Sequence, residues 1–413
     1  MNDPQEKRLN ALLSVYACEP NRGSEPGIGW GTVEQVSRFH DVWVITSEEY
    51  RPVIQPYVAK NPQPNVNWYY VDIPKWLHLR KQQEHGRIHY YLWQISAYFK
   101  GREIARTVKL DCVHHVTYGS YWTPCFLALL PLPFIWGPVG GGESSPRSFY
   151  RTFSFSGRIQ EIIRDVVRRI AHFDPFLHIT ARRAKIALST TEDSAVPMRR
   201  LGAKSVEILP NIALSKSELA VLDAVPPKNE GVFRAISAGR LLQWKGLHLG
   251  LQAFAELLKE RPASEYWIFG DGSERANLEH LTAELGIGEQ VRFWGNVSRT
   301  ELLQKLGESD ILLHPSLHDS GGYICLEAMA AGRPVVCLDL GGPGVIVTKE
   351  TGVKIAAISP EQTVADLTKA LKELSDNPQL IKKMGEAAKQ RIQENFEWEK
   401  KGNQLADLYR RIY

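Results

Sequence analysis

The stretch HPSLHDSGGYICLEAM, from His314 to Met329, decides the fold because it joins a strand end, a glycine pair and two carboxylates. The short run Asp310 to Leu313 before it predicts a buried strand, and the residues from Gly321 onward predict a helix with an apolar face. The stretch therefore predicts a strand, a polar loop and a helix, with the loop at the carboxyl end of the strand.

Two carboxylates occupy defined places in this unit. Asp319 is expected at the start of the helix, and Glu327 about two turns inside it. The first turn of a helix has unpaired N–H groups and a positive dipole, so it can hold an anion without a dedicated side chain. Gly321 and Gly322 would let a ligand reach those amides. In the alternative interpretation, Asp319 or Ser320 only caps the helix and Glu327 faces solvent.

The pattern of an acidic residue, seven others and a glutamate, followed by AMAAGRPVV and GG, resembles the signature of GT4-type retaining glycosyltransferases of the GT-B fold. The resemblance implies that Glu327 contacts the ribose of a nucleotide sugar and that Asp319 touches the donor sugar. It also implies that the loop between them, with Gly321, Gly322 and Tyr323, lines the same site. Asp319 stands where that family commonly has glutamate, so it reaches less far by one methylene.

Arg240 and Lys245, in GRLLQWKG, follow the first strand predicted in the C-terminal half. Two cations on a loop at the carboxyl edge of a sheet suit a diphosphate, because the planar guanidinium binds oxygens in pairs and lysine supplies a point charge. The alternative is a solvated pair on a surface turn. The segment resembles the G-R-x-x-x-x-K-G element of GT4-type enzymes, which implies that both residues hold the leaving phosphates. By the same resemblance, GNVSRTEL places Asn296 and Val297 at the nucleobase.

The length of 413 residues exceeds one ordinary core and predicts two domains. With 43% hydrophobic and 23% charged residues the chain is globular, and its net charge of +4 indicates no particular partner, nucleic acid included. Strand and helix patterns alternate throughout, so the expected class is α/β. The resemblance implies two facing Rossmann-like, doubly wound domains with a cleft between them. We expect an N-terminal acceptor-side domain at 1–214, a linker at 215–231, a nucleotide-sugar-binding domain at 232–395, and at 396–413 a helix that packs back toward the N-terminal domain.

Glycines after the first predicted strand suggest a ligand loop. Gly27 and Gly29, in PGIGWG, begin a predicted helix and match the first part of a dinucleotide-binding fingerprint, with Glu48 or Glu49 about twenty residues on. Thr32 occupies the place of the third glycine, which weakens that interpretation. The loop also resembles the N-terminal loop of GT-B enzymes, which faces the donor phosphates and the acceptor.

Two further loops follow strands of the same half. HHVTYG places His114 and His115 at a strand end, where doubly wound sheets bind ligands. Either could instead be a hydrogen-bonded structural histidine, and the resemblance favours His115 for contact with the donor sugar. FIWGPVGGG ends in glycines that leave backbone amides bare, so Gly141 is a candidate contact.

Basic and aromatic residues alternate in two stretches, Lys75 to Arg106 and Ser145 to Arg183. The second contains isoleucines and valines at helical spacing, which predicts an amphipathic helix that either covers a core or lies on an anionic membrane. The N-terminus lacks the apolar segment of a signal peptide, and the longest apolar run is too short to span a bilayer. We therefore expect a cytoplasmic protein that binds the inner face of the membrane peripherally.

Five cysteines, Cys18, Cys112, Cys125, Cys325 and Cys337, are scattered and form no C-x-x-C pair, which favours reduced core thiols. The resemblance implies a retaining glycosyltransferase without metal or cofactor. It would use a UDP-sugar, with a GDP-sugar as the second choice, and a glycan or lipid-linked acceptor. The alternatives are a noncatalytic nucleotide-sugar-binding protein and a dinucleotide-dependent oxidoreductase.

Overall fold

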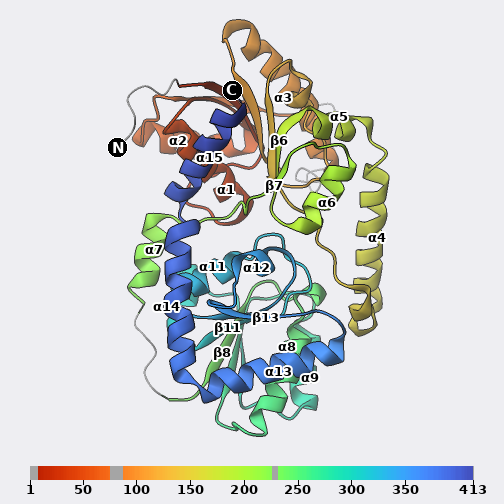
Figure 1. Ribbon diagram of the computed structural model, residues 1–413, viewed down its shortest axis with the longest axis vertical. Coiled ribbons are helices and arrows are strands. Elements are labelled where there is room, and N and C mark those ends of the chain that lie inside the picture. The colour runs from red at the N-terminus through yellow and green to blue at the C-terminus, as the bar shows by residue number, and fades with distance from the viewer. Residues whose placement is uncertain (1–7, 75–86, 226–230, 413) are drawn as a thin grey trace. The chain divides into compact units, whose positions relative to one another are not determined.

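The computed structural model describes residues 8–74, 87–225 and 231–412, and these form two compact units. The first unit comprises Met1–Gly142, Val166–Asn211 and Trp398–Tyr413, and the second comprises Glu143–Asp165 and Ile212–Glu397. Each unit is built on a parallel sheet with helices (Figure 1). The expected α/β class and the two Rossmann-like domains are therefore confirmed.

The sheet of the first unit has, within the described residues, seven strands in the order β3-β2-β1-β4-β5-β6-β7. Strands β4 and β5 are buried along their whole length, which explains why CVHHVT and FIWGPV read as continuous runs instead of alternating patterns. The strands are β1 Asn10–Val15, β2 Asp41–Ser47, β3 Val66–Val71, β4 Cys112–Thr117, β5 Phe134–Val139, β6 Ala184–Ser189 and β7 Val206–Ile208. The helices are α1 Ser24–Ser37, α2 Arg51–Lys60, α3 Arg87–Thr107, α5 Pro175–Arg183, α6 Glu192–Arg200 and α15 Trp398–Ile412.

The sheet of the second unit has, in the part of the chain described, six strands in the order β10-β9-β8-β11-β12-β13. This is the doubly wound order, in which the strand order reverses between the first and fourth strands, here β8 and β11. The strands are β8 Arg234–Ala238, β9 Glu265–Phe269, β10 Val291–Gly295, β11 Ile311–His314, β12 Val335–Leu338 and β13 Gly352–Ile355. The helices are α7 Lys216–Asp223, α8 Leu247–Leu258, α9 Arg275–Glu284, α10 Arg299–Gly307, α11 Tyr323–Ala330, α12 Gly341–Ile346, α13 Pro360–Asp376 and α14 Pro378–Asn395.

One helix, α4 (Phe155–Ala171), runs from residues of the second unit into residues of the first. The segment before it belongs to the second unit, not to the N-terminal domain expected at 1–214, because Phe149 and Phe153 are buried in the second core. The C-terminal helix α15 lies beside α1 in the first unit (Figure 1), and Gly31 of α1 allows the ring of Trp398 to approach closely.

The expected linker at 215–231 contains helix α7 instead of an extended segment. Ser215 and Glu218 form a capping box, in which each side chain accepts a hydrogen bond from the backbone of the other residue. This box fixes the helix start and gives Glu218 a defined position. Residues 226–230 of the expected linker lie outside the described residues.

The basic and aromatic stretch from Lys75 to Arg106 differs from its expected role at the membrane. Residues 75–86 lie outside the described part of the chain, and the remainder forms helix α3. Tyr90 and Trp93 are 1% and 0% exposed and pack against Tyr16 in the first core, so they cannot face a bilayer. Ile88 and Phe99 of the same helix are exposed, because they lie on its opposite side.

Candidate functional site

The turning point between β8 and β11 brings two loops together at the carboxyl edge of the second sheet. The loop after β8 carries Arg240 and Lys245, and the loop after β11 carries Asp319. The Leu317 amide donates to the Trp244 carbonyl at 2.8 Å, which fixes one loop against the other. Gly246 adopts a φ of 64°, and a side chain there would collide with the Pro315 carbonyl. Residues 70 positions apart therefore share one edge of the sheet.

Asp319 is held at the start of α11 by both of its carboxylate oxygens. Its Oδ1 accepts from the amides of Gly321 at 3.2 Å and Gly322 at 3.0 Å. Its Oδ2 lies 2.6 Å from the ammonium nitrogen of Lys245. The side chain thus places a negative charge on amides that would otherwise lack partners. The helix begins at Tyr323 and not at Gly321 as expected, and its N-cap is Gly322 without a side-chain cap, so Asp319 binds the loop amides just before the helix and does not cap it.

His314, the last residue of β11, is the third charged or titratable group at this point. Its Nε2 lies 3.4 Å from Asp319 Oδ2, an electrostatic contact beneath the loop. Burial opposes ionisation of Asp319, but His314 and Lys245 outweigh it and hold the pKa of this carboxyl well below its usual range. Burial lowers the pKa of His314, while Asp319 opposes that shift. Asp319 is therefore a carboxylate at neutral pH.

Glu327 lies inside α11 and is 6% exposed, so the interpretation as a solvent-facing residue is wrong. Its Oε1 accepts from Arg299 Nε at 3.0 Å and from Nη2 at 2.7 Å. Burial raises the pKa of Glu327, and the guanidinium of Arg299 opposes this shift. Both of these hydrogen bonds go to Oε1, so the second carboxylate oxygen of Glu327 remains available as an acceptor.

Arg299 also binds a second carboxylate, so that three helices meet at one guanidinium. Its Nη2 lies 2.7 Å from Glu218 Oε1 of α7, and the Tyr323 hydroxyl donates to the same oxygen at 2.8 Å. Glu218, Arg299, Tyr323 and Glu327 therefore form one network across α7, α10 and α11. Tyr323, which the resemblance placed at the donor, holds this network through its hydroxyl.

The remaining candidates of the second unit surround these groups without joining the network. Arg240 is exposed, and no hydrogen bond or ion pair of its side chain occurs among the described residues. Asn296 is exposed and Val297 half-buried, on the turn between β10 and α10. Ser298 then caps α10 by accepting from the Glu301 amide at 3.2 Å. Arg240 is thus available to a ligand, and Asn296 is accessible.

Two further contacts reach the loop after β11 from residues 143–165. Glu143 is buried and accepts a short hydrogen bond from the Ser320 hydroxyl. His318 lies between Glu161, at 3.2 Å, and the guanidinium of Arg164, and its ring stacks on Trp244. These contacts fix the residues immediately before and after Asp319. They also show why the segment 143–165 belongs to the second unit.

The N-terminal candidates are more enclosed than the sequence suggests. His115 is fully buried, its Nε2 lies 3.3 Å from the Tyr118 carbonyl, and burial lowers its pKa to about 4, so it is neutral. His114 contacts the Tyr409 hydroxyl at 2.8 Å and the Gly137 carbonyl at 2.6 Å, so both of its nitrogens have structural partners. Of the two histidines, His115 is the one whose Nδ1 has no hydrogen-bond partner among the described residues.

The N-terminal glycines serve close packing. Gly27 and Gly29 lie within α1, which begins at Ser24 and not at Gly27 as expected. A side chain at Gly27 would meet the Arg22 carbonyl at 1.9 Å, and one at Gly29 would meet the Ala17 carbonyl at 2.1 Å. Gly141 adopts a φ of 85°, which explains the glycine there by backbone conformation. The expected open phosphate loop at Gly27 and Gly29 is thus replaced by a helix packed on its preceding loop.

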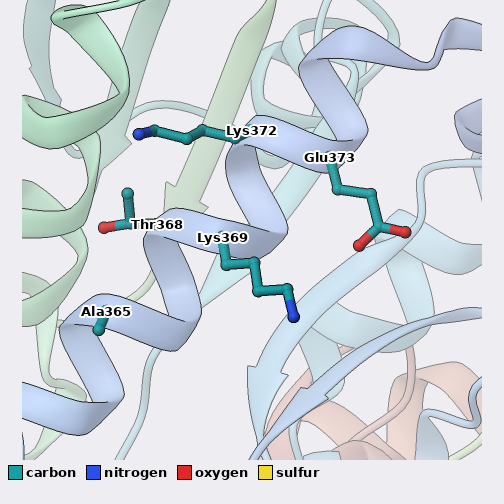
Figure 2. A pocket seen from close by; sticks show the side chains of 5 residues that line it. All are labelled: Ala365, Thr368, Lys369, Lys372 and Glu373. Atoms are coloured by element: carbon teal, nitrogen blue, oxygen red, sulfur yellow. The ribbon is translucent and has the colours of Figure 1, made fainter.

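A hollow of about 500 Å³ on helix α13 lies apart from these groups and is lined by Ala365, Thr368, Lys369, Lys372 and Glu373 (Figure 2). Lys372 is paired with Glu260 at 2.6 Å. Within the described ranges, no group of three or more His, Cys, Asp or Glu side chains is arranged to hold a metal ion. All five cysteines are free and buried, as expected. No helix among the described residues is long and apolar enough to cross a membrane.

The sequence interpretation missed Arg299, Glu218, His314 and Glu143 as members of the site. Arg299 and Glu218 each lie in an S-x-x-E segment, SRTE and SKSE, which is a pattern typical of a helix start. Their contacts to Glu327 and Tyr323 join positions more than 20 residues apart, for which the sequence carries no local signal. His314 stands in the quoted stretch itself, at the end of the strand.

Comparison with known proteins shows what this chain is similar to. Residues 221–391 match the family described as glycosyl transferases group 1. A glycogen synthase of Mycobacterium tuberculosis is 31% identical over 180 residues, covering 43% of this chain and 42% of that protein. LpsD of Rhizobium meliloti, a lipopolysaccharide core biosynthesis glycosyltransferase, is 28% identical over 222 residues, covering 54% and 62%. The chain thus matches less than two thirds of the length of either relative.

Among solved structures, HepE of Anabaena in complex with UDP-glucose superimposes with a TM-score of 0.60 at 15% identity. The alignment covers 97% of this chain and 99% of that one. At this identity the likeness establishes the fold alone, and the fold is GT-B. The sequence expectation of this fold is confirmed.

Proposed function

Because the chain belongs to the group 1 glycosyltransferase family through residues 221–391, we propose that it transfers a sugar from a nucleotide diphosphate sugar to an acceptor with retention of anomeric configuration. The observation that carries this proposal is the meeting of Lys245, Asp319 and the loop amides just before α11 at the turning point of the second sheet. Doubly wound sheets bind their ligands at such points.

The diphosphate is assigned to the two cations and the helix start. Arg240 is exposed and unpaired among the described residues, so it can engage phosphate oxygens, while Lys245 is already directed at the loop after β11. During transfer, the bond from the anomeric carbon to the diphosphate breaks and negative charge develops on the departing oxygen. Fixed cations and amides stabilise that charge, which is the work a divalent metal does elsewhere. We assign no metal or cofactor to the reaction.

The remaining residues are assigned to other parts of the donor. The free oxygen of buried Glu327 is assigned to the ribose hydroxyls, and Asn296 and Val297 to the base. Asp319 is assigned to the transferred sugar, whereas His115 is fully buried in the first unit and is given no contact with it. The acceptor hydroxyl attacks on the face from which the diphosphate leaves, and its proton passes to a phosphate oxygen. A UDP-sugar is favoured over a GDP-sugar because HepE, of the same fold, holds UDP-glucose.

The acceptor is assigned to a glycan or a lipid-linked glycan of polysaccharide or glycolipid synthesis. LpsD, with which this chain shares 28% identity, acts in lipopolysaccharide core biosynthesis. A lipid-linked acceptor also requires an enzyme that works at the inner face of a membrane, so we propose a peripheral cytoplasmic location. The reaction and the location are separate parts of the proposal and are tested separately.

A nucleotide-sugar panel tests the reaction. Thermal unfolding with UDP-glucose, UDP-galactose, UDP-N-acetylglucosamine, GDP-mannose and ADP-glucose should show stabilisation by one of them, because a ligand that binds only the folded state raises its stability. The same donor should then release its nucleoside diphosphate by transfer or slow hydrolysis, and Glu327→Gln should reduce that release. Product NMR should show the anomeric configuration of the donor.

Two alternatives give different results in this panel. Stabilisation by a nucleotide sugar without any release of nucleoside diphosphate would indicate a noncatalytic binding protein, which the pairing of Lys245 with Asp319 alone would favour. Stabilisation by a nicotinamide or flavin nucleotide instead would indicate an oxidoreductase. Failure of every nucleotide sugar to stabilise the protein would overturn the proposed function.

A further inference from the structure

Helix α4 is amphipathic in the reverse of the usual sense, with a row of apolar side chains in solvent and both of its acidic side chains on the side that faces the protein. The apolar row recurs at intervals of three, four and seven residues, which places it on one side of a helix. Its members and their exposed fractions are Phe155 79%, Ile159 38%, Ile162 53%, Ile163 55%, Val166 45% and Ile170 63%. The row continues past the helix end to Phe173, which is 85% exposed.

The opposite side of α4 is polar and buried. The Glu161 carboxylate is 2% exposed and is paired with Arg164 at 2.6 Å and with His318. Arg168 is 8% exposed and donates from Nη1 to the Gly142 carbonyl at 3.3 Å. The rotation of the helix about its axis is thus fixed by ion pairs of Glu161 before residue 165 and by a hydrogen bond of Arg168 after it. The apolar row cannot turn inward without breaking them.

An apolar row of this length is rarely left in water, because single-chain soluble proteins seldom expose contiguous apolar patches. The usual explanation of an amphipathic helix, that its apolar face covers a core, does not apply to α4. Something outside the chain is therefore expected to cover the row. The charges beside the row determine what that is.

The charges around the row are positive. Arg158 and Arg169 are exposed and border it, whereas both acidic residues of the helix, Glu161 and Asp165, lie on the protein-facing side. Residues 145–183 contain eight arginines and three acidic residues. Such a surface attracts anionic headgroups. Phenylalanines stand at both ends of the row, about 25 Å apart along the helix, which suits an element that lies flat in the interfacial layer.

We propose that α4 docks this chain on an anionic bilayer, with the apolar row in the interfacial layer and Arg158 and Arg169 among the headgroups. The docking surface stands on the geometry of α4 alone. Its use, which is to hold the enzyme beside a lipid-linked acceptor, rests on the proposed function. A second copy of the chain would be a different occupant of the same row, and the experiment below distinguishes it.

Cosedimentation of the full chain with vesicles tests the proposal. Phosphatidylcholine vesicles with about one third phosphatidylglycerol should bind the protein, pure phosphatidylcholine should bind it at least about tenfold more weakly, and binding should weaken as salt shortens the Debye length. The pair Phe155→Ser and Phe173→Ser should reduce binding at least about tenfold, as should the pair Arg158→Glu and Arg169→Glu. The control is Ile358→Ser, because Ile358 is 67% exposed and lies far from α4 in sequence.

The outcomes of this experiment distinguish an anionic bilayer from a second copy of the chain as the occupant of the row. Equal binding to neutral and anionic vesicles, or unchanged binding by the phenylalanine pair, would overturn the proposal. A dimer in light scattering without lipid that the phenylalanine pair converts to monomer would also overturn it, by assigning the row to a second copy. Phe155 and Phe173 are exposed, so thermal unfolding and stabilisation by the nucleotide sugar should match wild type in the phenylalanine pair, whereas Arg158→Glu also removes hydrogen bonds to the carbonyls of Phe153 and Arg151. Vesicle binding without any nucleotide-sugar stabilisation would reject the proposed function and leave the docking surface intact.

Discussion

The ammonium nitrogen of Lys245 lies 2.6 Å from one carboxylate oxygen of Asp319, while the other oxygen accepts from the amides of Gly321 and Gly322. Asp319 therefore presents to this cation and to these two amides an anionic acceptor like that of a phosphate. A donor diphosphate would compete with this carboxylate for the same groups. The shorter side chain, where the related family commonly has glutamate, keeps the carboxylate close to the helix.

This relationship predicts opposite effects of Asp319→Asn on binding and on transfer. UDP affinity should rise about three- to tenfold, because the neutral amide releases Lys245 and removes a charge that repels the diphosphate. Sugar transfer should fall at least about a hundredfold, because Asp319 is assigned to the donor sugar. Calorimetry with UDP and initial rates measure the two. Asp376→Asn is the control, since Asp376 is paired with Arg261 on an exposed surface. A fall in UDP affinity would contradict the competition.

Removing either cation of the loop after β8 should slow transfer without unfolding the protein. Arg240→Ala and Lys245→Ala should each cost on the order of 2 to 4 kcal/mol in transition-state stabilisation, because each is assigned to the departing diphosphate. Rates at subsaturating donor give this quantity directly. Lys259→Ala is a matched control, because Lys259 is 69% exposed and pairs with Glu256 on the surface. Rates within about threefold of wild type for either variant would remove that residue from the assignment.

Glu327→Gln should weaken nucleotide binding while leaving the fold intact. An amide is a weaker acceptor for ribose hydroxyls than a carboxylate is, and it cannot pair with Arg299 as an ion. Calorimetry with UDP, uridine and uracil measures the effect, since uridine differs from uracil by the ribose alone. Equal UDP affinity in the variant and wild type would show that Glu327 serves the Arg299 network alone.

Arg299→Gln should make donor binding sensitive to pH. Burial raises the pKa of Glu327 and Arg299 opposes that rise, so removing the guanidinium should raise the pKa further. A larger fraction of Glu327 would then be protonated as pH falls toward neutrality, and donor affinity should fall with it. The Michaelis constant measured from about pH 6 to 9 should show this slope in Arg299→Gln and lose it in the double variant with Glu327→Gln. A purely structural role would reduce activity equally at all pH values.

Lys401 of α15 predicts a pH dependence of stability in the first unit. Burial lowers its pKa to about 7, and its ammonium nitrogen donates to the Pro210 carbonyl. Between pH 7 and the unperturbed value of about 10.4, the unfolded chain binds the proton that the folded chain has lost, so this group adds stability as pH rises. The difference in unfolding free energy between wild type and Lys401→Met should therefore grow by at most about 1.4 kcal/mol per pH unit. Urea titrations at pH 7.5 and 9 measure it, and parallel pH profiles would contradict it.

The local signals of the sequence predicted most elements of the fold. The run before His314 is β11, and the glycines after Asp319 do precede a helix, whose first residue is Tyr323. The glycines of PGIGWG were placed correctly in the chain but interpreted wrongly, because Gly27 and Gly29 serve close backbone packing inside α1. A glycine indicates a position where a side chain does not fit. The sequence alone does not distinguish a position that is close to a ligand from one that is close to the protein's own backbone.

The site was predictable as far as each residue belongs to a strand end or a helix start. The roles of Arg299 and Glu218 could not be predicted from the sequence. Their contacts to Glu327 and Tyr323 depend on how α7, α10 and α11 pack. The periodicity of residues 155–170 likewise predicted a helix with an apolar side. Which side faces solvent depends on Glu161 and Arg168 finding buried partners, and periodicity carries no information about that.

Helix α15 has a consequence for how the protein is made. Leu405, Leu408 and Tyr409 fill the core beneath β1 and β4, and the Tyr409 hydroxyl contacts His114. The first sheet is thus synthesised early, but part of its core is supplied by a helix that is translated after the second unit. The second unit is translated in between and can fold while the first still lacks this helix. Nascent chains would therefore carry an open apolar face until α15 is made, and a stop codon before Trp398 should impair the N-terminal unit most.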